Sequence, residues 1–177
     1  MMRDLLSRLR SDESGAAIIE LAIIAPIFAA MTIGVVDISN ACGRKLALEQ
    51  GAQRAIERVM QTTGDTTVED TIKDEAVKQV NGLNADGSAK SGPITAANVT
   101  VTYRLECTDS AGVITNQSST DSDTFDGFYC STGTVTEAKY IQVAVTDTYA
   151  PMFPIHFGAL SSDGTYHLSA IAGMRTK

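Results

Sequence analysis

Positive charge is scarce in this sequence. Its 14 Lys and Arg residues stand against 21 Asp and Glu residues, which gives a formal net charge of −7 at pH 7. Proteins that bind nucleic acids concentrate Lys and Arg in a stripe or patch, because those cations neutralise phosphates. The sequence has no such stripe, so we expect no nucleic-acid partner.

The residues of common catalytic sites are also few. The two histidines are His156 and His167, and neither lies near a Gly-x-Ser-x-Gly nucleophile motif, which is absent. The sequence has no glycine-rich phosphate-binding loop and no Cys-x-x-Cys or His/Cys cluster at zinc spacing. We therefore expect no enzymatic activity and no cofactor.

One acidic run approaches a metal-binding motif. Asp121, Asp123 and Asp126 precede Gly127, in an order that approaches the EF-hand pattern Asp-x-[Asp/Asn]-x-[Asp/Asn]-Gly. An extra residue displaces the third acid, and no glutamate follows at the required position. A solvated loop is therefore the default interpretation, and a calcium site is the alternative.

Cysteine is limited to three residues, which still suffice for one disulfide. Cys107 and Cys130 enclose the polar residues 108–129, and two such cysteines in an exported domain predict a bond between them. Closing a loop of that length stabilises a fold by about 3 kcal/mol on the loop-entropy model. Cys42 is left over, and we interpret it as a small helix-packing residue.

Against these absences stands one long apolar run. Residues 16–36 (AAIIELAIIAPIFAAMTIGVV) contain a single charged residue, Glu20. As a helix this run would be roughly 30 Å long, the thickness of a bilayer's hydrocarbon core. A cleaved secretory signal is the competing interpretation, but its apolar region is shorter and leads into a cleavage loop. We predict a single transmembrane helix.

The orientation of this helix rests on two features. Three cations precede the run and two follow it, a slight bias that places the N-terminus in the cytoplasm. The predicted disulfide lies after the run and favours an oxidising compartment for that part, which agrees. The cations are Arg3, Arg8 and Arg10 before the run, and Arg44 and Lys45 after it.

Residues 37–63 continue the helix as an amphipathic segment. One face carries apolar residues at spacings of three, four or seven, and another carries polar residues four apart, of which Lys45 and Glu49 can form an ion pair. We expect the apolar face to pack on a domain. The apolar residues are Ala41, Leu48, Ala52, Ala55 and Val59, and the polar ones are Lys45, Glu49, Gln53 and Glu57.

A second helix is predicted shortly afterwards. Thr66 and Glu69 have the spacing of a capping box, in which side chains satisfy the free backbone N–H groups at a helix start. Asn81-Gly82 ends the helix. The apolar residues between these signals are Val68, Ile72, Ala76 and Val80.

Alternating patterns predict antiparallel strands over residues 98–108, 139–149 and 166–174. The segment 109–135, rich in Ser, Thr, Asp and Gly, is expected to be a loop. Helices followed by strands are typical of an α+β fold. We therefore expect residues 64–177 to form an extracytoplasmic α+β domain, with a small antiparallel sheet packed on both helices.

Glu20 is the residue of the apolar run that most needs an explanation. A carboxylate near the centre of a spanning helix costs about 2.5–3.5 kcal/mol on insertion scales. Because Glu20 lies only four residues into the run, its side chain can reach the headgroups, which is one interpretation. The other is that a positive group from another subunit compensates the charge.

The residues around Glu20 resemble a known processing signal. Gly15-Ala-Ala-Ile-Ile-Glu20 looks like the class III signal of type IV prepilins, which a membrane peptidase cuts after the glycine. Cutting here would make Ala16 the new N-terminus and Glu20 its fifth residue. Pro26, Asp37 and the C-terminal Ala172-Gly-Met-Arg175 resemble the TadE-like minor pilins of the tight-adherence (Tad) pilus.

This resemblance implies a pilin-like fold and a role in assembly. Residues 1–15 would be a cleaved leader, and Glu20 would face the α-amino group of Ala16 on a neighbouring subunit. Pro26 would remove a backbone hydrogen bond and kink the helix. The implied partners are other pilin subunits through the helix, the prepilin peptidase and the inner-membrane assembly machinery. The implied location is the bacterial inner membrane and then the pilus or cell surface.

The chain departs from the bulk subunits of the Tad pilus. Those are much shorter, and a tyrosine commonly follows their glutamate, whereas Leu21 follows Glu20 here. The sequence therefore predicts a minor pilin or pseudopilin needed for pilus assembly or surface adhesion. Two alternatives stay open: a secretion-system pseudopilin, and an uncleaved single-pass anchor for a periplasmic binding or scaffold domain.

Overall fold

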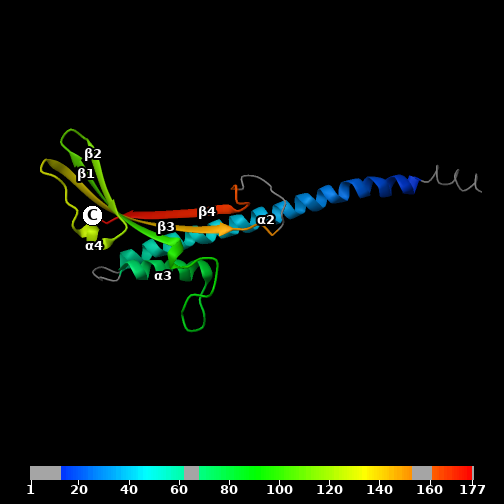
Figure 1. Ribbon diagram of the computed structural model, residues 1–177, viewed down its shortest axis with the longest axis horizontal. Helices are drawn as coiled ribbons and strands as arrows, with labels where there is room; N and C mark the ends of the chain where they lie inside the picture. Colours follow the sequence, from blue (N-terminus) through cyan, green and yellow to red (C-terminus); the bar gives the residue numbers. More distant parts are fainter. Residues whose placement is uncertain (1–12, 62–67, 153–160, 177) are drawn as a thin grey trace, which may run out of the picture.

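The computed structural model describes residues 13–61, 68–152 and 161–176. Residues 1–12 of the predicted leader, Thr66 of the predicted capping box and His156 lie outside the described residues. The described chain has two main helices followed by a four-stranded antiparallel sheet, so the predicted α+β fold is confirmed (Figure 1).

Helix α2 (Glu13–Gln61) is a single element that joins the predicted spanning and amphipathic segments. It passes through Pro26 without ending, and it begins two residues before Gly15. Its N-terminal half projects from the rest of the molecule as a stalk, and its C-terminal half lies along the sheet (Figure 1). The prediction of one continuous helix is confirmed.

The sheet has the strand order β2-β1-β3-β4, and every neighbouring pair is antiparallel. The side chains that the alternating patterns assigned to one face lie on it: in β1 (Val99–Asp109), for example, Val99, Val101 and Leu105 are buried between exposed or half-buried neighbours. The predicted third and fourth segments correspond to β3 (Thr134–Tyr149) and β4 (Tyr166–Arg175).

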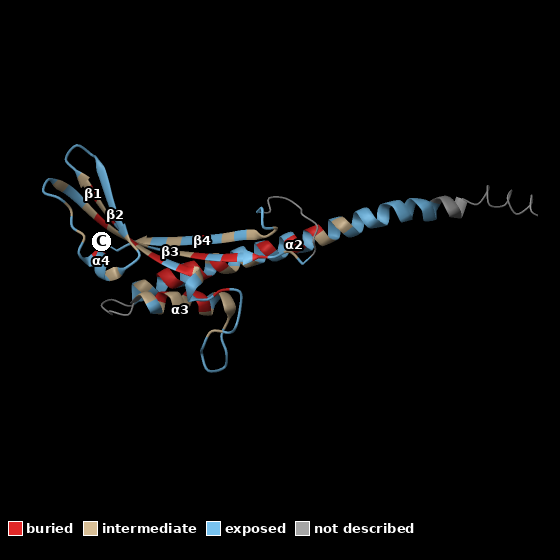
Figure 2. Ribbon diagram, viewed as in Figure 1, coloured by how far each residue is buried: buried red, intermediate tan, exposed pale blue. Residues whose placement is uncertain are grey.

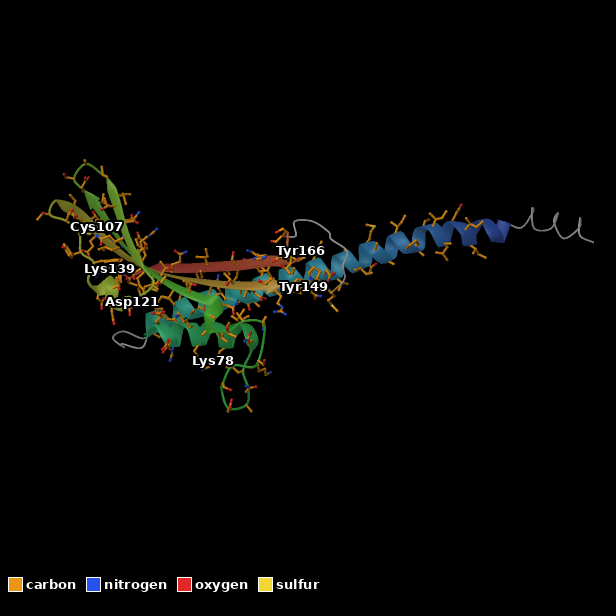
Figure 3. The ribbon with its side chains drawn as sticks, in the orientation of Figure 1. Lys78, Cys107, Asp121, Lys139, Tyr149 and Tyr166 are labelled. Atoms are coloured by element: carbon orange, nitrogen blue, oxygen red, sulfur yellow. A yellow bond between two sulfur atoms is a disulfide. The ribbon has the colours of Figure 1, made fainter. Side chains whose placement is uncertain are left out.

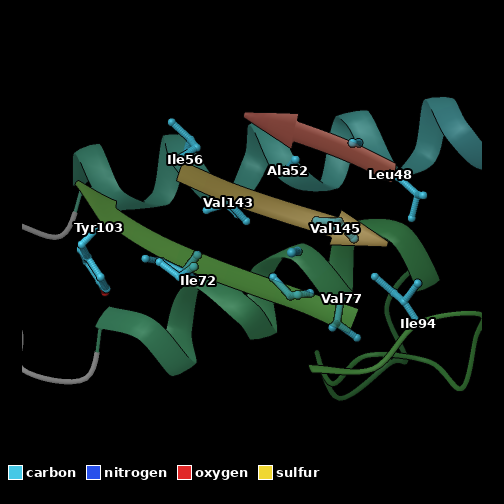
Figure 4. Close-up of a cluster of buried hydrophobic side chains, with 14 of the residues drawn as sticks. Leu48, Ala52, Ile56, Ile72, Val77, Ile94, Tyr103, Val143 and Val145 are labelled. Carbon is cyan, nitrogen blue, oxygen red and sulfur yellow. The ribbon is translucent and has the colours of Figure 1, made fainter. Parts of the chain in front are cut away.

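One face of this sheet is covered by α3 (Val68–Asn81) and the C-terminal half of α2, which also contact each other. The hydrophobic core lies between these layers (Figure 4). Gly51 permits the close approach of the two helices, because a Cβ there would lie 2.5 Å from Cγ2 of Val80. Buried side chains of the core include Leu48, Ala52, Ala55, Ile72, Ala76, Ile94, Val101, Leu105, Val143 and Val145.

The prediction of a loop over residues 109–135 is wrong. The segment contains an edge strand, β2 (Ile114–Ser119), and a short helix, α4 (Ser122–Asp126), and β3 begins five residues earlier than predicted. Strand β2 is exposed on both faces and is held by backbone pairing with β1. It therefore shows no alternation of apolar and polar residues from which a strand could be predicted.

The predicted disulfide between Cys107 and Cys130 is confirmed, with their Cα atoms 5.7 Å apart. It ties the inner face of β1 to the chain that follows α4. Phe125 of α4 is buried there and stacks on Tyr103, with ring centroids 5.4 Å apart. Cys42 is exposed and does not pack within the chain, so its predicted role in helix packing stays a prediction about contacts with another molecule.

Candidate functional site

The stalk of α2 is apolar and lies outside the packed domain. Large hydrophobic side chains on every side of the helix are exposed over residues 17–36, and most of the stalk has the colour of exposed residues in Figure 2. The helix is long and apolar enough to cross a membrane. The side chains that expose more than half of their surface are Ile18, Ile19, Leu21, Ile23, Ile27, Phe28, Met31 and Val35.

The predicted site residues occupy the first third of this helix. Gly15 and Ala16 lie in its first turns, Glu20 follows one turn later, and Pro26 lies within the stalk. Glu20 is exposed and, among the residues that the structure describes, has no hydrogen-bond or ion-pair partner. A carboxylate thus stands on an otherwise apolar surface, where a partner from another molecule can reach it.

A buried acid marks the point where the stalk meets the domain. Asp37 is 4% exposed, and its Oδ1 accepts hydrogen bonds from the backbone N–H of Met152 at 3.0 Å and the hydroxyl of Tyr149 at 3.4 Å. Figure 3 shows Tyr149 beside Tyr166 where the sheet reaches α2; their ring centroids are 6.3 Å apart. These contacts fasten the end of β3 to the helix.

A second polar contact lies two turns further along α2. Arg44 donates from a terminal guanidinium nitrogen to Oδ2 of Asp147 at 3.2 Å, and the Asp147 side chain is nearly buried. The guanidinium also lies 6.0 Å from the centroid of the Tyr149 ring. Together, Asp37, Arg44, Asp147 and Tyr149 form what we call the junction cluster. It fixes the axial position of the domain on the helix.

A family model matches part of the chain, and the matched residues lie in α2. Residues 15–56 match the family model described as TadE-like protein. Over these residues α2 is similar to TadE-like proteins. The match runs from the predicted cleavage site through Glu20, Pro26 and Asp37 to the part of α2 that packs on the sheet. No curated protein and no solved structure matches the chain.

Asp37 was expected only as part of a family pattern, and Asp147 was not predicted as a functional residue. A signal for Asp147 was present, because it follows Val143 and Val145 at a spacing of two and so falls on the buried face of its strand. An acid on an apolar face requires a partner. The partner, Arg44, lies about 100 residues earlier, and only the fold brings the two together.

The acidic run of the calcium alternative has a structural use of its own. Asp121 is the N-cap of α4, and its carboxylate accepts from the backbone N–H of Thr124 at 3.1 Å and from the Thr124 hydroxyl. These hydrogen bonds lower the pKa of Asp121. Asp123 and Asp126 belong to the helix that Asp121 caps. Within the described part of the chain, no three acids, histidines or cysteines group together as metal ligands.

Proposed function

We propose that this chain is a minor pilin-like subunit of a Tad pilus, cleaved after Gly15 and needed for pilus assembly or surface adhesion. The observation that carries the proposal is the exposed apolar stalk, which belongs to a TadE-like segment and leads from a domain with a complete core of its own. Such a stalk suits a bilayer first and a bundle of pilin helices afterwards. The protein acts through assembly and has no catalytic role.

The chemistry of assembly centres on Glu20. Cleavage after Gly15 leaves a positive α-amino group on Ala16, and an exposed Glu20 on a neighbouring subunit can pair with it in the apolar bundle. A buried pair of this kind adds little net stability, but a subunit in the wrong axial position leaves two uncompensated charges. The pair therefore selects the register of the helices.

Replacing this acid tests the assembly role. Glu20→Ala should abolish incorporation into pili, as measured in sheared pilus fractions, while the protein persists in membranes at its normal level. Glu49→Ala is the matched control, because it removes an exposed acid from the half of α2 that lies along the sheet. If Glu20→Ala pili assemble normally, Glu20 does not act in register selection.

Processing is tested separately by intact mass. The mature protein should lack residues 1–15 and begin at Ala16, and Gly15→Val should leave the full-length chain in the membrane. A mature protein that retains Met1 or Met2 would favour the alternative function, an uncleaved anchor for a periplasmic binding or scaffold domain.

A further inference from the structure

The apolar surface of α2 continues past the point where the domain begins. Beyond Asp37, Ile38 is 47% exposed, Leu46 is 58% exposed, and Cys42 between them is exposed. Lipid accounts for exposed apolar side chains in the stalk, but these three lie beside the water-soluble domain. Leu46 lies nine residues past Asp37, about 14 Å along the helix.

These three residues extend a regular pattern. Going back along the stalk, Val35, Met31 and Phe28 precede Ile38 at alternating spacings of three and four, and all three are exposed. From Phe28 to Leu46 the spacings are three, four, three, four and four, which keeps these side chains on one side of the helix. We call this set the outer stripe: Phe28, Met31, Val35, Ile38, Cys42 and Leu46.

The outer stripe is distinct from the face that packs on the domain. That face contains Ala41, Leu48 and Ala52, which are buried by the sheet and α3. The stripe ends after Leu46, because the next residues on the same side of the helix, Glu49 and Gln53, are polar. The change from apolar to polar residues limits the expected contact to the stalk and about two turns beyond it.

We infer that the outer stripe pairs with the outer stripe of a second copy of this chain, side by side and parallel in the membrane. All copies insert in the same direction, so their stripes are parallel by necessity. In a two-fold pair each residue lies near its own counterpart, and a charged residue would face a like charge. The outer stripe has no charged residue, which makes it self-compatible.

The part of the stripe outside the membrane drives this pairing most strongly. Within lipid, helices gain no hydrophobic free energy from contact and rely on packing alone. Ile38 and Leu46 leave water when they pair, and each buried Leu or Ile is worth roughly 1.5–3 kcal/mol. This inference goes beyond the proposed function, because it concerns the chain in the membrane and does not depend on cleavage after Gly15.

Cys42 allows the pairing of two outer stripes to be tested by disulfide cross-linking. Of its three cysteines, Cys107 and Cys130 form the disulfide, and Cys42 is the free thiol, placed within the stripe. Mild oxidation of membranes that contain the full chain should yield a reducible product of twice the chain's mass. Cys42→Ser should remove it. In that background, Leu46→Cys should restore the product, whereas Gly43→Cys, also exposed but off the stripe, should not.

A charge substitution tests the contact without moving the probe. Leu46→Asp should lower the cross-linked fraction at Cys42 at least about tenfold, since two leucines lose their burial and two like charges face each other. Asn40→Asp is the matched control, since Asn40 is exposed but lies on the side of the helix away from the stripe, and it should leave the fraction unchanged.

Three results would overturn the inference. They are no product at Cys42, equal products from Leu46→Cys and Gly43→Cys, and a product whose mass shows a different partner protein. The test also separates this inference from the proposed function. A Gly15→Val chain that keeps its leader should cross-link as well as the wild type, and a chain that is processed but never cross-links contradicts the pairing alone.

Discussion

Residues 17–36 and residues 37–61 belong to one helix, yet they are built for different surroundings. The first half carries large apolar side chains that are exposed on every side, whereas the second half buries apolar side chains against the sheet and α3, several of them small, such as Ala52 and Ala55. Small residues allow the close contact that a fold of this size needs. The large exposed side chains of the stalk are suited to contact with lipid or with the helices of other molecules.

The junction cluster marks the change between the two halves. Asp37 follows directly after the stalk and binds the end of β3, so the domain begins at a fixed position on α2. The stalk can then respond to lipid or to other helices without disturbing the core. If this separation is real, substitutions on the two sides of Asp37 should affect different properties.

The largest expected difference comes from truncating one leucine in each half. Leu48 is fully buried, so Leu48→Ala should lower the free energy of unfolding of the domain by about 2–5 kcal/mol. Leu21→Ala, on the exposed stalk, should leave that free energy unchanged. Denaturant unfolding of the full chain in detergent, followed by tyrosine fluorescence, measures both, since the chain has five tyrosines and no tryptophan. Equal effects would contradict the independence of the two halves.

The disulfide gives the next largest effect and should act on the domain alone. Replacing Cys107 and Cys130 together by Ser should lower the free energy of unfolding by about 3 kcal/mol, because the unfolded chain regains the freedom of the closed loop. Cys42→Ser is the control and should cost close to nothing, since Cys42 is exposed and unbonded. The same fluorescence assay detects the difference, and a Cys42→Ser loss of similar size would contradict it.

Much of this comparison could be predicted from the sequence, because the first half of α2 is a continuous apolar run and the second half has apolar residues at helical spacing. The apolar run predicted the stalk, and residues such as Leu48 and Ala52 at helical spacing predicted the packed face. Strands β1, β3 and β4 were predicted for the same reason, since one side of each faces the core. The packed half of α2 and these three strands each have a buried face, and that face leaves a periodic pattern in the sequence.

The remaining features lack such a pattern. Strand β2 has no buried face, and α4 depends on a local cap from Asp121 and on the burial of Phe125. The contact between Arg44 and Asp147 joins residues far apart in the chain, so neither residue alone indicates its partner. The role of Glu20 was predicted in another way, from the resemblance of the surrounding residues to a processing signal and not from periodicity.

Breaking the junction cluster should have a smaller effect than either change in the core. Among the residues that the structure describes, Arg44→Met leaves the nearly buried carboxylate of Asp147 with the backbone N–H of Thr148 alone, so the free energy of unfolding should fall by about 1–3 kcal/mol. Lys45→Met removes a neighbouring cation whose pair with Glu49 is exposed, and it should cost below about 1 kcal/mol. Equal losses in the tyrosine fluorescence assay would mean that burial of Asp147 does not matter.

The smallest effect concerns the turn before β4, at the surface of the domain. Nε2 of His167 lies 2.8 Å from Oδ2 of Asp163, and Thr165 donates to the other carboxylate oxygen from its hydroxyl and its backbone N–H. These contacts, the one with His167 first, lower the pKa of Asp163 from 3.8 to about 2. Between these two pH values the unfolded chain binds more protons than the folded one. The contacts therefore stabilise the fold above about pH 4, and this contribution is lost as the pH falls through about 2.

Titration of the Asp163 carboxyl by NMR in the full chain checks this directly. The wild type should titrate near pH 2, and His167→Ala should raise the pKa toward its ordinary value without reaching it, because the hydrogen bonds from Thr165 remain. Both residues are exposed, so the change should alter neither cross-linking at Cys42 nor the unfolding of the core at neutral pH. An Asp163 pKa that is the same with and without His167 would show that Thr165 alone holds the carboxylate. A change in cross-linking would show that the surface of the domain and the stalk are coupled after all.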